Sequence, residues 1–193
     1  MPLINELTRL ATDFVSDTTV SMSAAHEWLA KQGVNLCAVL DVAAFPSELA
    51  GVWRDAKVNV GPLEKLVLLG MGGSGLWDRI RQENYPEAQL FDLASEKAVL
   101  EVCRRFWGVS EPRLLYPGPA LIPLQKLGRW AGWASPSPIG IDISPRYGPW
   151  FAYRAAFLVD APLEYTKTFT VNSPCDDCEP KPCIQACPGR AVT

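Results

Sequence analysis

The sequence predicts an α/β or α+β domain in which helices are layered against a sheet. Apolar, strand-like runs alternate along the chain with segments of helical periodicity, which is typical of a layered domain. The 193 residues are enough for one domain with an appendage and for a sizeable core. Apolar residues make up 48% and charged residues 20% of the chain, so we expect it to fold rather than to be disordered.

The first half of the chain contains helical spacings and two strand-like runs. Leu3, Leu7, Leu10 and Phe14 recur at helical spacing and predict an opening amphipathic helix. The other elements expected in this half are a helix over 24–31 that stops at Gly33, a strand over 36–42, a break at 45–46, a strand over 65–69 and a helix over 76–82.

The second half continues the alternation. The elements expected here are a helix over 91–106 that ends at Gly108, a strand over 113–116, a helix over 121–133, a strand over 139–143 and a strand over 150–159. Ile139, Ile141 and Ile143 alternate with polar or small residues, as in a half-buried strand. The segment 166–174 is polar and rich in turn residues. We therefore divide the chain into a cofactor-binding domain over 1–165 and a cysteine segment over 166–193, which we expect to lie back over the sheet.

Four of the six cysteines lie within thirteen residues, at Cys175, Cys178, Cys183 and Cys187. In a reducing cytosol such crowding favours metal ligation over disulfides. The spacing C-x2-C-x4-C-x3-C-P is two residues longer in the middle than the bacterial ferredoxin motif. It predicts a [4Fe–4S] cluster, and the adjacent acidic residues indicate a low potential. Zinc, disulfides and an inert thiol cluster stay open as alternatives, as does the question whether Cys187 serves a second cluster completed beyond residue 193.

Charge and hydropathy exclude some function classes. The net charge of −3 and the pI near 5.2 argue against a general nucleic-acid binder. The apolar stretches are too short to span a bilayer, and no signal peptide is evident, so we expect a cytoplasmic protein without a membrane partner. His26 is the only histidine, which argues against a hydrolytic Ser/His/Asp or Cys/His set.

A glycine loop follows the strand predicted at 65–69. Residues 70–75 satisfy G-x-G-x-x-G, and Asp92 stands where a ribose-binding acid would be expected, so an NAD(P)-dependent reductase is one hypothesis. Asp92 could equally cap a helix that starts near Leu93. Backbone amides at Gly72, Gly73 and Ser74 could hold a phosphate or carboxylate of some ligand. The other reading of the loop is a tight strand-to-helix turn that requires glycine.

The run from Ser144 to Arg154 reads Ser-Pro-Arg-Tyr-Gly-Pro-Trp-Phe-Ala-Tyr-Arg. It resembles the CblC (MMACHC-type) cobalamin-processing family, whose hallmark is a His/Ser-Pro-Arg-aromatic-Gly turn followed by Trp-Phe-Ala-x-Arg. The stretch 66–79 also looks like that family's strand, loop and helix. Together with the cysteines, the chain is more weakly similar to epoxyqueuosine reductases and reductive dehalogenases. The resemblance covers residues 66–187.

This resemblance implies a nitroreductase-like or flavin-reductase-like sheet with a corrin against it and the nucleotide tail detached from cobalt. The positions that match cofactor-binding segments of the family, beyond the glycine loop, are Tyr116, Ser137, Ile139, Gly140, Arg146, Tyr147, Trp150 and Arg154. Ser137 stands where the thiol-handling family has arginine, so glutathione-dependent dealkylation is not expected. A histidine of the family's corrin pocket is also missing.

Arg154 is unusual because it is a guanidinium within an apolar strand. A buried guanidinium requires an anionic partner, and the candidates are Asp142, Asp160 and a phosphate of the ligand. The function that we expect is that of an iron–sulfur oxidoreductase that passes single electrons from a [4Fe–4S] cluster to a cobalamin. A flavin in place of the corrin and a protein redox partner stay open as possibilities. The alternatives are a non-enzymatic ferredoxin-like carrier or cobalamin chaperone, and the NAD(P)-dependent reductase.

Overall fold

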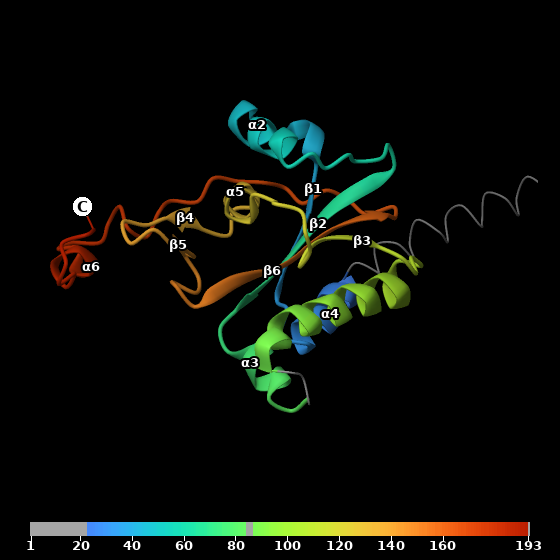
Figure 1. Cartoon of the computed structure of the whole chain (residues 1–193), viewed down its shortest axis with the longest axis horizontal. Coiled ribbons are helices and arrows are strands. Elements are labelled where there is room, and N and C mark those ends of the chain that lie inside the picture. Colours follow the sequence, from blue (N-terminus) through green and yellow to red (C-terminus); the bar gives the residue numbers. More distant parts are fainter. Residues whose placement is uncertain (1–22, 84–86, 193) are drawn as a thin grey trace, which may run out of the picture.

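The centre of the computed structural model, which describes residues 23–83 and 87–192, is a four-stranded sheet (Figure 1). The strands, in spatial order, are β1 (Leu36–Leu40), β2 (Glu64–Gly72), β6 (Phe151–Asp160) and β3 (Arg113–Tyr116). Every neighbouring pair is antiparallel. The two longest strands, β2 and β6, lie in the middle, so their side chains can be covered on both faces.

Helices cover both faces of this sheet (Figure 1). The helix over 23–31, α3 (Gly75–Ile80) and α4 (Leu90–Phe106) pack on one face, which we call the α4 face. On the other face, the α5 face, lie α2 (Ser47–Asp55) and α5 (Leu124–Trp130). Successive residues of a strand point to opposite faces. Accordingly Val67 and Leu69 enter the first core and Leu66 and Leu68 the second, which confirms the predicted layered class.

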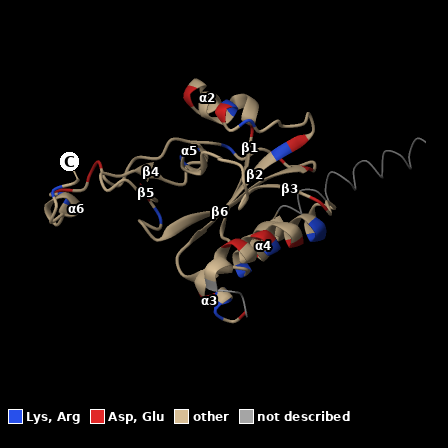
Figure 2. Cartoon of the chain, viewed as in Figure 1, with Lys and Arg blue, Asp and Glu red and all other residues tan. Residues whose placement is uncertain are grey.

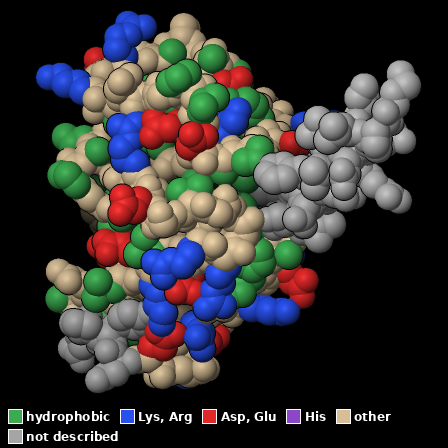
Figure 3. Space-filling view, turned by 90° about the vertical axis from the view of Figure 1, so that its right-hand side faces the viewer, with side chains coloured by type: hydrophobic (Ala, Val, Ile, Leu, Met, Phe, Trp, Pro, Cys, Tyr) green, Lys and Arg blue, Asp and Glu red, His purple; other side chains and the backbone are tan. Residues whose placement is uncertain are grey.

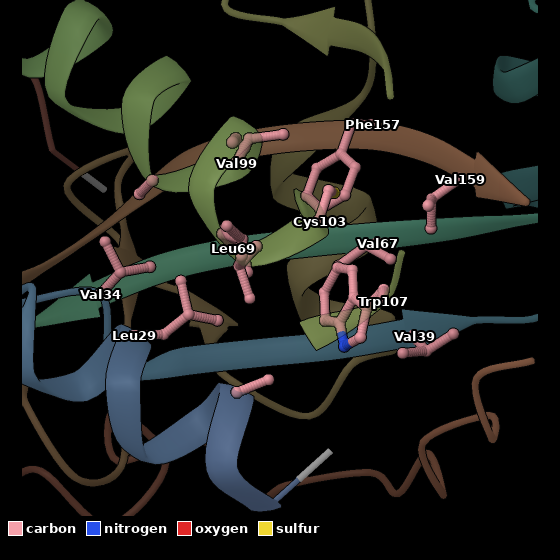
Figure 4. Packing of buried hydrophobic residues seen from close by; sticks show 14 of the residues in the cluster. Leu29, Val34, Val39, Val67, Leu69, Val99, Cys103, Trp107, Phe157 and Val159 are labelled. Atoms are coloured by element: carbon pink, nitrogen blue, oxygen red, sulfur yellow. The ribbon is translucent and has the colours of Figure 1, made fainter. Parts of the chain in front are cut away.

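The core on the α4 face is built around Phe157 of β6 (Figure 4). The Trp107 ring stacks beside it, with the two ring centroids 6.2 Å apart. Leu29 from the helix over 23–31 and Cys103 from α4 are fully buried in the same cluster. Burying a side chain such as Phe157 stabilises the fold by roughly 1.5–3 kcal/mol. Cys103 therefore serves as a small apolar core residue.

Most of the predicted elements are confirmed within a few residues. The helix predicted over 91–106 is α4, and the strand predicted over 113–116 is β3. Asp92 lies in the first turn of α4 and does not cap it, since the helix begins at Leu90. The helix α2 follows the break at Phe45–Pro46 and was not predicted. The opening helix predicted over 3–14 lies outside the described residues.

The strand predicted over 139–143 is wrong. Its place is taken by a small hairpin of β4 (Ser135–Pro136) and β5 (Asp142–Ile143), joined by a turn. Ser137 closes this turn, because its N–H and its hydroxyl both donate to the carbonyl of Ile141, at 3.1 and 2.6 Å. The alternation of isoleucines therefore places Ile139 and Ile141 on a solvent-exposed turn rather than in a sheet.

The segment after β6 passes the edge of the sheet and then leaves it. Thr166 N–H donates to Val39 O at 2.8 Å, and Val39 N–H donates to the Thr166 hydroxyl at 2.9 Å. The chain then continues to α6 (Pro182–Gln185), which Figure 1 shows beyond β4 and β5 and away from the sheet. The expectation that the cysteines lie over the sheet is therefore wrong. The cysteine segment has too few large apolar side chains to bind there by hydrophobic burial.

The remaining short helices are η1 (Val42–Ala44) and η2 (Glu87–Gln89). No helix among the described residues is long and apolar enough to cross a membrane. Charged side chains are frequent along α4, whereas the β4–β5 hairpin is drawn mostly without charge (Figure 2). On the face shown in Figure 3, described basic and acidic side chains lie side by side. Arg105 and Glu101 of α4 form one of the described ion pairs.

Candidate functional site

Hydrogen bonds join the end of β2 to Asn35, just before β1, and to Trp150, just before β6. Gly72 N–H donates to Asn35 Oδ1 at 2.7 Å, and Asn35 Nδ2 donates back to Gly72 O at 2.9 Å. The next residue, Gly73, donates its N–H to Trp150 O at 2.8 Å. Gly73 has a φ of +79°, a conformation that favours glycine. This geometry turns the chain from β2 into α3 beside the start of β6.

Tyr147 lies directly on Gly72. A Cβ atom at position 72 would come within 2.3 Å of Tyr147 Cδ2, so only glycine leaves room for the ring. The turn that carries Tyr147 is closed by two hydrogen bonds between Ser144 and Gly148, at 2.9 and 2.8 Å. The guanidinium of Arg146 lies over the same ring, 5.2 Å from its centroid. The glycine at position 72 is thus required for packing.

Trp150 is the most exposed aromatic side chain of this region, with 77% of its surface accessible. The structure therefore brings together four of the predicted residues, Gly72, Gly73, Tyr147 and Trp150, with Arg146 above the Tyr147 ring. We call these five residues the sheet-end site. A large apolar side chain that is not covered by the protein is a surface suited to an apolar ligand.

The site opens on the α5 face. A Cβ atom at Gly70, two residues before Gly72, would meet Trp133 at 2.9 Å, and Trp133 packs against the core of that face. The Trp133 and Tyr153 rings are stacked, with centroids 6.3 Å apart. Phe151 meets Tyr153 edge to face at 5.4 Å. An aromatic cluster therefore lies on the α5 side of β6, next to the sheet-end site.

The β4–β5 hairpin holds Ser137, Ile139 and Gly140. Ile139 and Ile141 are 42% and 43% exposed. The hairpin is connected to the sheet-end site through β5 and the turn over 144–148. Two apolar side chains of the turn, together with Trp150, thus give this end of the molecule an exposed apolar surface, with Arg146 as its charged neighbour.

A buried carboxylate fixes the hairpin to the domain. Arg129 of α5 donates from Nε and Nη2 to Asp142 Oδ1, at 2.9 and 2.6 Å. Tyr153 of β6 donates its hydroxyl to Asp142 Oδ2 at 2.7 Å. Only 2% of the Asp142 side chain is exposed. The idea that Asp142 pairs with Arg154 is therefore wrong, because both of its oxygens are bonded to other groups.

Arg154 lies on the opposite face of β6. Its guanidinium is 4.9 Å from the centroid of the Phe91 ring of α4. Its Nε is buried, and no described residue accepts a hydrogen bond from it. Burial lowers the pKa of Arg154, while the nearby Tyr116 and Asp92 act in the other direction. Arg154 and Tyr116 thus form a separate group from the sheet-end site.

The topology removes the basis of the nicotinamide hypothesis. A dinucleotide-binding fold needs parallel strands joined through a helix, whereas β2 is antiparallel to both of its neighbours. The first glycines of the motif, Gly70 and Gly72, lie within β2. The Ser74 hydroxyl donates to Asp78 Oδ2 at 2.8 Å and is already used within the protein.

The four clustered cysteines are all partly exposed. Among the residues that the structure describes, no three Cys, His, Asp or Glu side chains come close enough to hold a metal ion. Cysteine thiolates are the usual ligands of an iron–sulfur cluster, but the four sulfurs are not arranged around a common point in this structure. Metal ligation by Cys175, Cys178, Cys183 and Cys187 stays a prediction. The thiolate form of Cys187 is stabilised, because Ala191 N–H donates to Cys187 Sγ at 3.3 Å and lowers the pKa of this thiol.

Sequence reasoning missed two residues that organise the site. Asn35, just before β1, bonds both backbone groups of Gly72, although it is far from Gly72 in the sequence. Arg129 holds Asp142 from α5. No local pattern marks either residue, since each acts on a partner brought close only by folding.

A corrin fits the sheet-end site better than it fits an enclosed pocket. The corrin is a wide ring with large apolar faces, and Trp150, Ile139 and Ile141 offer it exposed apolar surface. A cavity beside α5 has a volume of about 480 Å³, which suits drug-sized molecules rather than a whole cobalamin. The sole histidine, His26, lies on the helix over 23–31, which packs on the other face. The sheet-end site therefore contains no imidazole that could bind the cobalt.

Comparison with known proteins finds similarity in structure alone. No protein-family model matches the sequence, and no curated protein matches it. A solved structure that resembles the chain is that of a C. elegans B12-trafficking protein CblC, a homologue of human MMACHC. The TM-score is 0.52 at 14% identity, over 84% of this chain and 79% of the other. The CblC resemblance is thereby confirmed as a shared fold.

Proposed function

We propose that the chain binds a cobalamin at the sheet-end site and the adjoining β4–β5 hairpin, and that it takes part in cobalamin processing or trafficking. The observation that carries this proposal is the fold shared with a B12-trafficking protein, over most of both chains. The exposed Trp150 on that fold supports it, since an uncovered indole is a natural contact for a large apolar ring.

The part of the protein in this function is to bind and orient the ring. Trp150, Ile139 and Ile141 exclude water from one corrin face, at about 25 cal/mol for each Å² of apolar surface removed from water. Arg146, beside Tyr147, can donate to a phosphate or amide at the ring edge. When bound, the cobalamin supplies a cobalt centre whose coordination number falls on one-electron reduction.

Equilibrium binding of hydroxocobalamin to two variants tests the proposal. Trp150→Ala removes the exposed indole, and Leu63→Ala is the matched control, because Leu63 is also a large exposed side chain but precedes the other end of β2. We expect affinity to fall by about tenfold or more in Trp150→Ala and to stay unchanged in Leu63→Ala. Equal affinity of the two variants would contradict the assignment of the site.

We propose further that the cysteine segment binds a metal centre that donates electrons to the cobalamin. The support is that four partly exposed thiols lie on one short segment, and that one of them accepts a backbone N–H bond. Metal sites are rarely preformed in the absence of the metal, so thiols that are apart in the free chain can converge on binding. If the cysteine segment binds no metal, the function that remains is that of a cobalamin carrier or chaperone.

Iron, acid-labile sulfide and zinc in anaerobically purified protein test this second proposal. We expect iron and sulfide in equal amounts, lost together in a Cys183→Ser variant and retained in Cys103→Ala, whose thiol lies in the core. Zinc without sulfide would identify a structural site. The absence of all three would leave no redox centre and would contradict the proposal. A parallel titration with flavin mononucleotide tests the flavin alternative.

A further inference from the structure

A cavity of about 480 Å³ lies on the α5 face, between α5, β4 and the chain that leads to the cysteine segment. It does not include the residues of the sheet-end site. Its volume is within the range of small-molecule sites. The described residues that line it are Arg129, Trp130, Ala134, Ser135, Pro136, Thr168, Phe169, Thr170 and Val171.

Ser135 supplies a hydrogen-bonding group that the protein does not use. The residue is only 8% exposed, and its Oγ is buried without a hydrogen-bond partner. A buried polar atom of this kind costs stability, so a native fold usually pairs it. Ser135 lines the cavity, so rotation of its hydroxyl about χ1 toward the cavity would let a ligand supply the missing partner.

Arg129 gives the same cavity a positive edge. Its Nε and Nη2 bond to Asp142 Oδ1, but a guanidinium has five N–H donors, so others remain. The Arg129 side chain is 35% exposed, whereas the Asp142 carboxylate is hidden behind it and also bonded by Tyr153. Among the described lining residues one is basic and none is acidic. The cavity therefore presents a cation to a ligand and conceals the counter-charge.

Apart from Thr168 and Thr170, the remaining lining residues are apolar. Trp130, Phe169 and Val171 provide ring and aliphatic surface, and Phe169 packs against Gly132, where an added Cβ would meet the Phe169 carbonyl at 2.9 Å. An apolar body with an acidic group at one end matches a cavity with apolar walls and one polar, positive end.

We infer that this cavity binds a small organic carboxylate, with the carboxylate on Arg129 and Ser135 and the apolar body against Trp130 and Phe169. The inference does not rest on cobalamin binding, since it concerns a different set of residues. A ligand held here would also contact residues 168–171, which connect the domain to the cysteine segment.

Benzoate and benzamide are a matched pair of probes for this site. They have the same ring and nearly the same shape, but only benzoate carries a negative charge at neutral pH. Chemical-shift titration of the labelled, full-length protein should show benzoate shifting the signals of residues 129–135 and 168–171. We expect benzamide to bind at least about tenfold more weakly, since a hydrogen bond to a charged group is the stronger. Equal binding of the two probes, or binding of neither, would overturn the inference.

Two serine variants separate a binding role of Ser135 from a structural one. In Ser135→Ala we expect benzoate affinity to fall about tenfold. The melting temperature of the ligand-free variant should be equal to or above that of the wild type, because no protein bond is lost. Ser95→Ala is the control, since its buried hydroxyl already donates to Phe91 O at 2.6 Å within α4. There the ligand-free stability should fall and the benzoate affinity should not. Unchanged affinity in Ser135→Ala would contradict the assignment, whatever the outcome for cobalamin.

Discussion

Tyr153 donates its hydroxyl to Asp142 Oδ2 at 2.7 Å, while Arg129 occupies the other oxygen of the same carboxylate. This single bond connects β6, a central strand of the sheet, to β5 of the exposed hairpin. Gly128 makes it possible, because a Cβ at that position would come within 2.0 Å of the Tyr153 ring. The position of the hairpin beside the sheet-end site thus depends on a buried polar group.

The stability of the protein should fall at alkaline pH through Tyr153. Burial, and next the hydrogen bond to Asp142, raise the pKa of Tyr153. A tyrosine in the unfolded chain ionises near pH ~10, so the unfolded state loses this proton first. The contribution of Tyr153 is therefore complete below about pH 10 and is lost as the pH rises above it. Urea unfolding at pH 8, 9, 10 and 11 measures this slope.

Tyr153→Phe should be less stable than the wild type at pH 8, by about 1–3 kcal/mol, because Asp142 loses a buried partner. Above pH ~10 its stability should fall less steeply than that of the wild type. Tyr165→Phe is the control, since Tyr165 is exposed. Parallel slopes for Tyr153→Phe and the wild type would show that Tyr153 does not titrate as described.

Gly72→Ala should destabilise the protein by about 1–3 kcal/mol, because the added methyl group displaces the Tyr147 ring. The same variant should bind cobalamin more weakly, since Tyr147 and Arg146 belong to the sheet-end site. In Gly51→Ala, within α2, an added Cβ meets nothing within 4 Å, so stability should rise by roughly 0.5–1 kcal/mol. Thermal unfolding of both variants checks the opposite signs.

The cysteines of the metal-free protein should differ strongly in reactivity toward iodoacetamide. Backbone N–H groups of Ala191 and Val192 lower the pKa of Cys187, so Cys187 should react fastest at pH 7. Burial raises the pKa of Cys103 to about 12, and this thiol should react only after unfolding. Mass spectrometry of timed digests gives the order. Rapid labelling of Cys103 in the folded protein would contradict the core described above.

Arg154→Met should retain cobalamin binding, because Arg154 points to the α4 face, whereas the sheet-end site opens on the other. Its folded stability should be equal to or higher than that of the wild type, since the buried Nε has no described partner. Binding measured beside Trp150→Ala supplies the comparison. A loss of affinity as large as that of Trp150→Ala would place Arg154 in contact with the ligand.

The elements predicted most accurately from the sequence are those marked by a repeated spacing of apolar residues. The spacing of Phe91, Ala98, Val102 and Phe106 indicates α4, and the apolar run that ends at Val159 indicates a strand covered on both faces, which β6 is. The Ser-Pro-Arg-Tyr-Gly sequence also forms a turn that leads into a strand, β6, as the family resemblance implied.

Local patterns failed where a distant contact decides the structure. The alternating isoleucines near Ile141 resemble a strand, but Ser137 closes a turn there and Asp142 is bonded to α5 and β6. The role of Asn35 depends on Gly72, which only the pairing of β1 with β2 brings close. The cysteine spacing describes which thiols could share a metal, but it does not determine where the free chain leaves them.

The visible absorption spectrum of cob(II)alamin, recorded anaerobically while the wild-type protein is added, tests the central claim most directly. The CblC resemblance implies a detached nucleotide tail, and the sheet-end site has no histidine to take its place on the cobalt. We therefore expect a saturable shift to the spectrum of the form without a nitrogen ligand. A spectrum that stays unchanged up to a large excess of protein would show that this sheet does not hold a cobalamin, and the proposed function would be wrong.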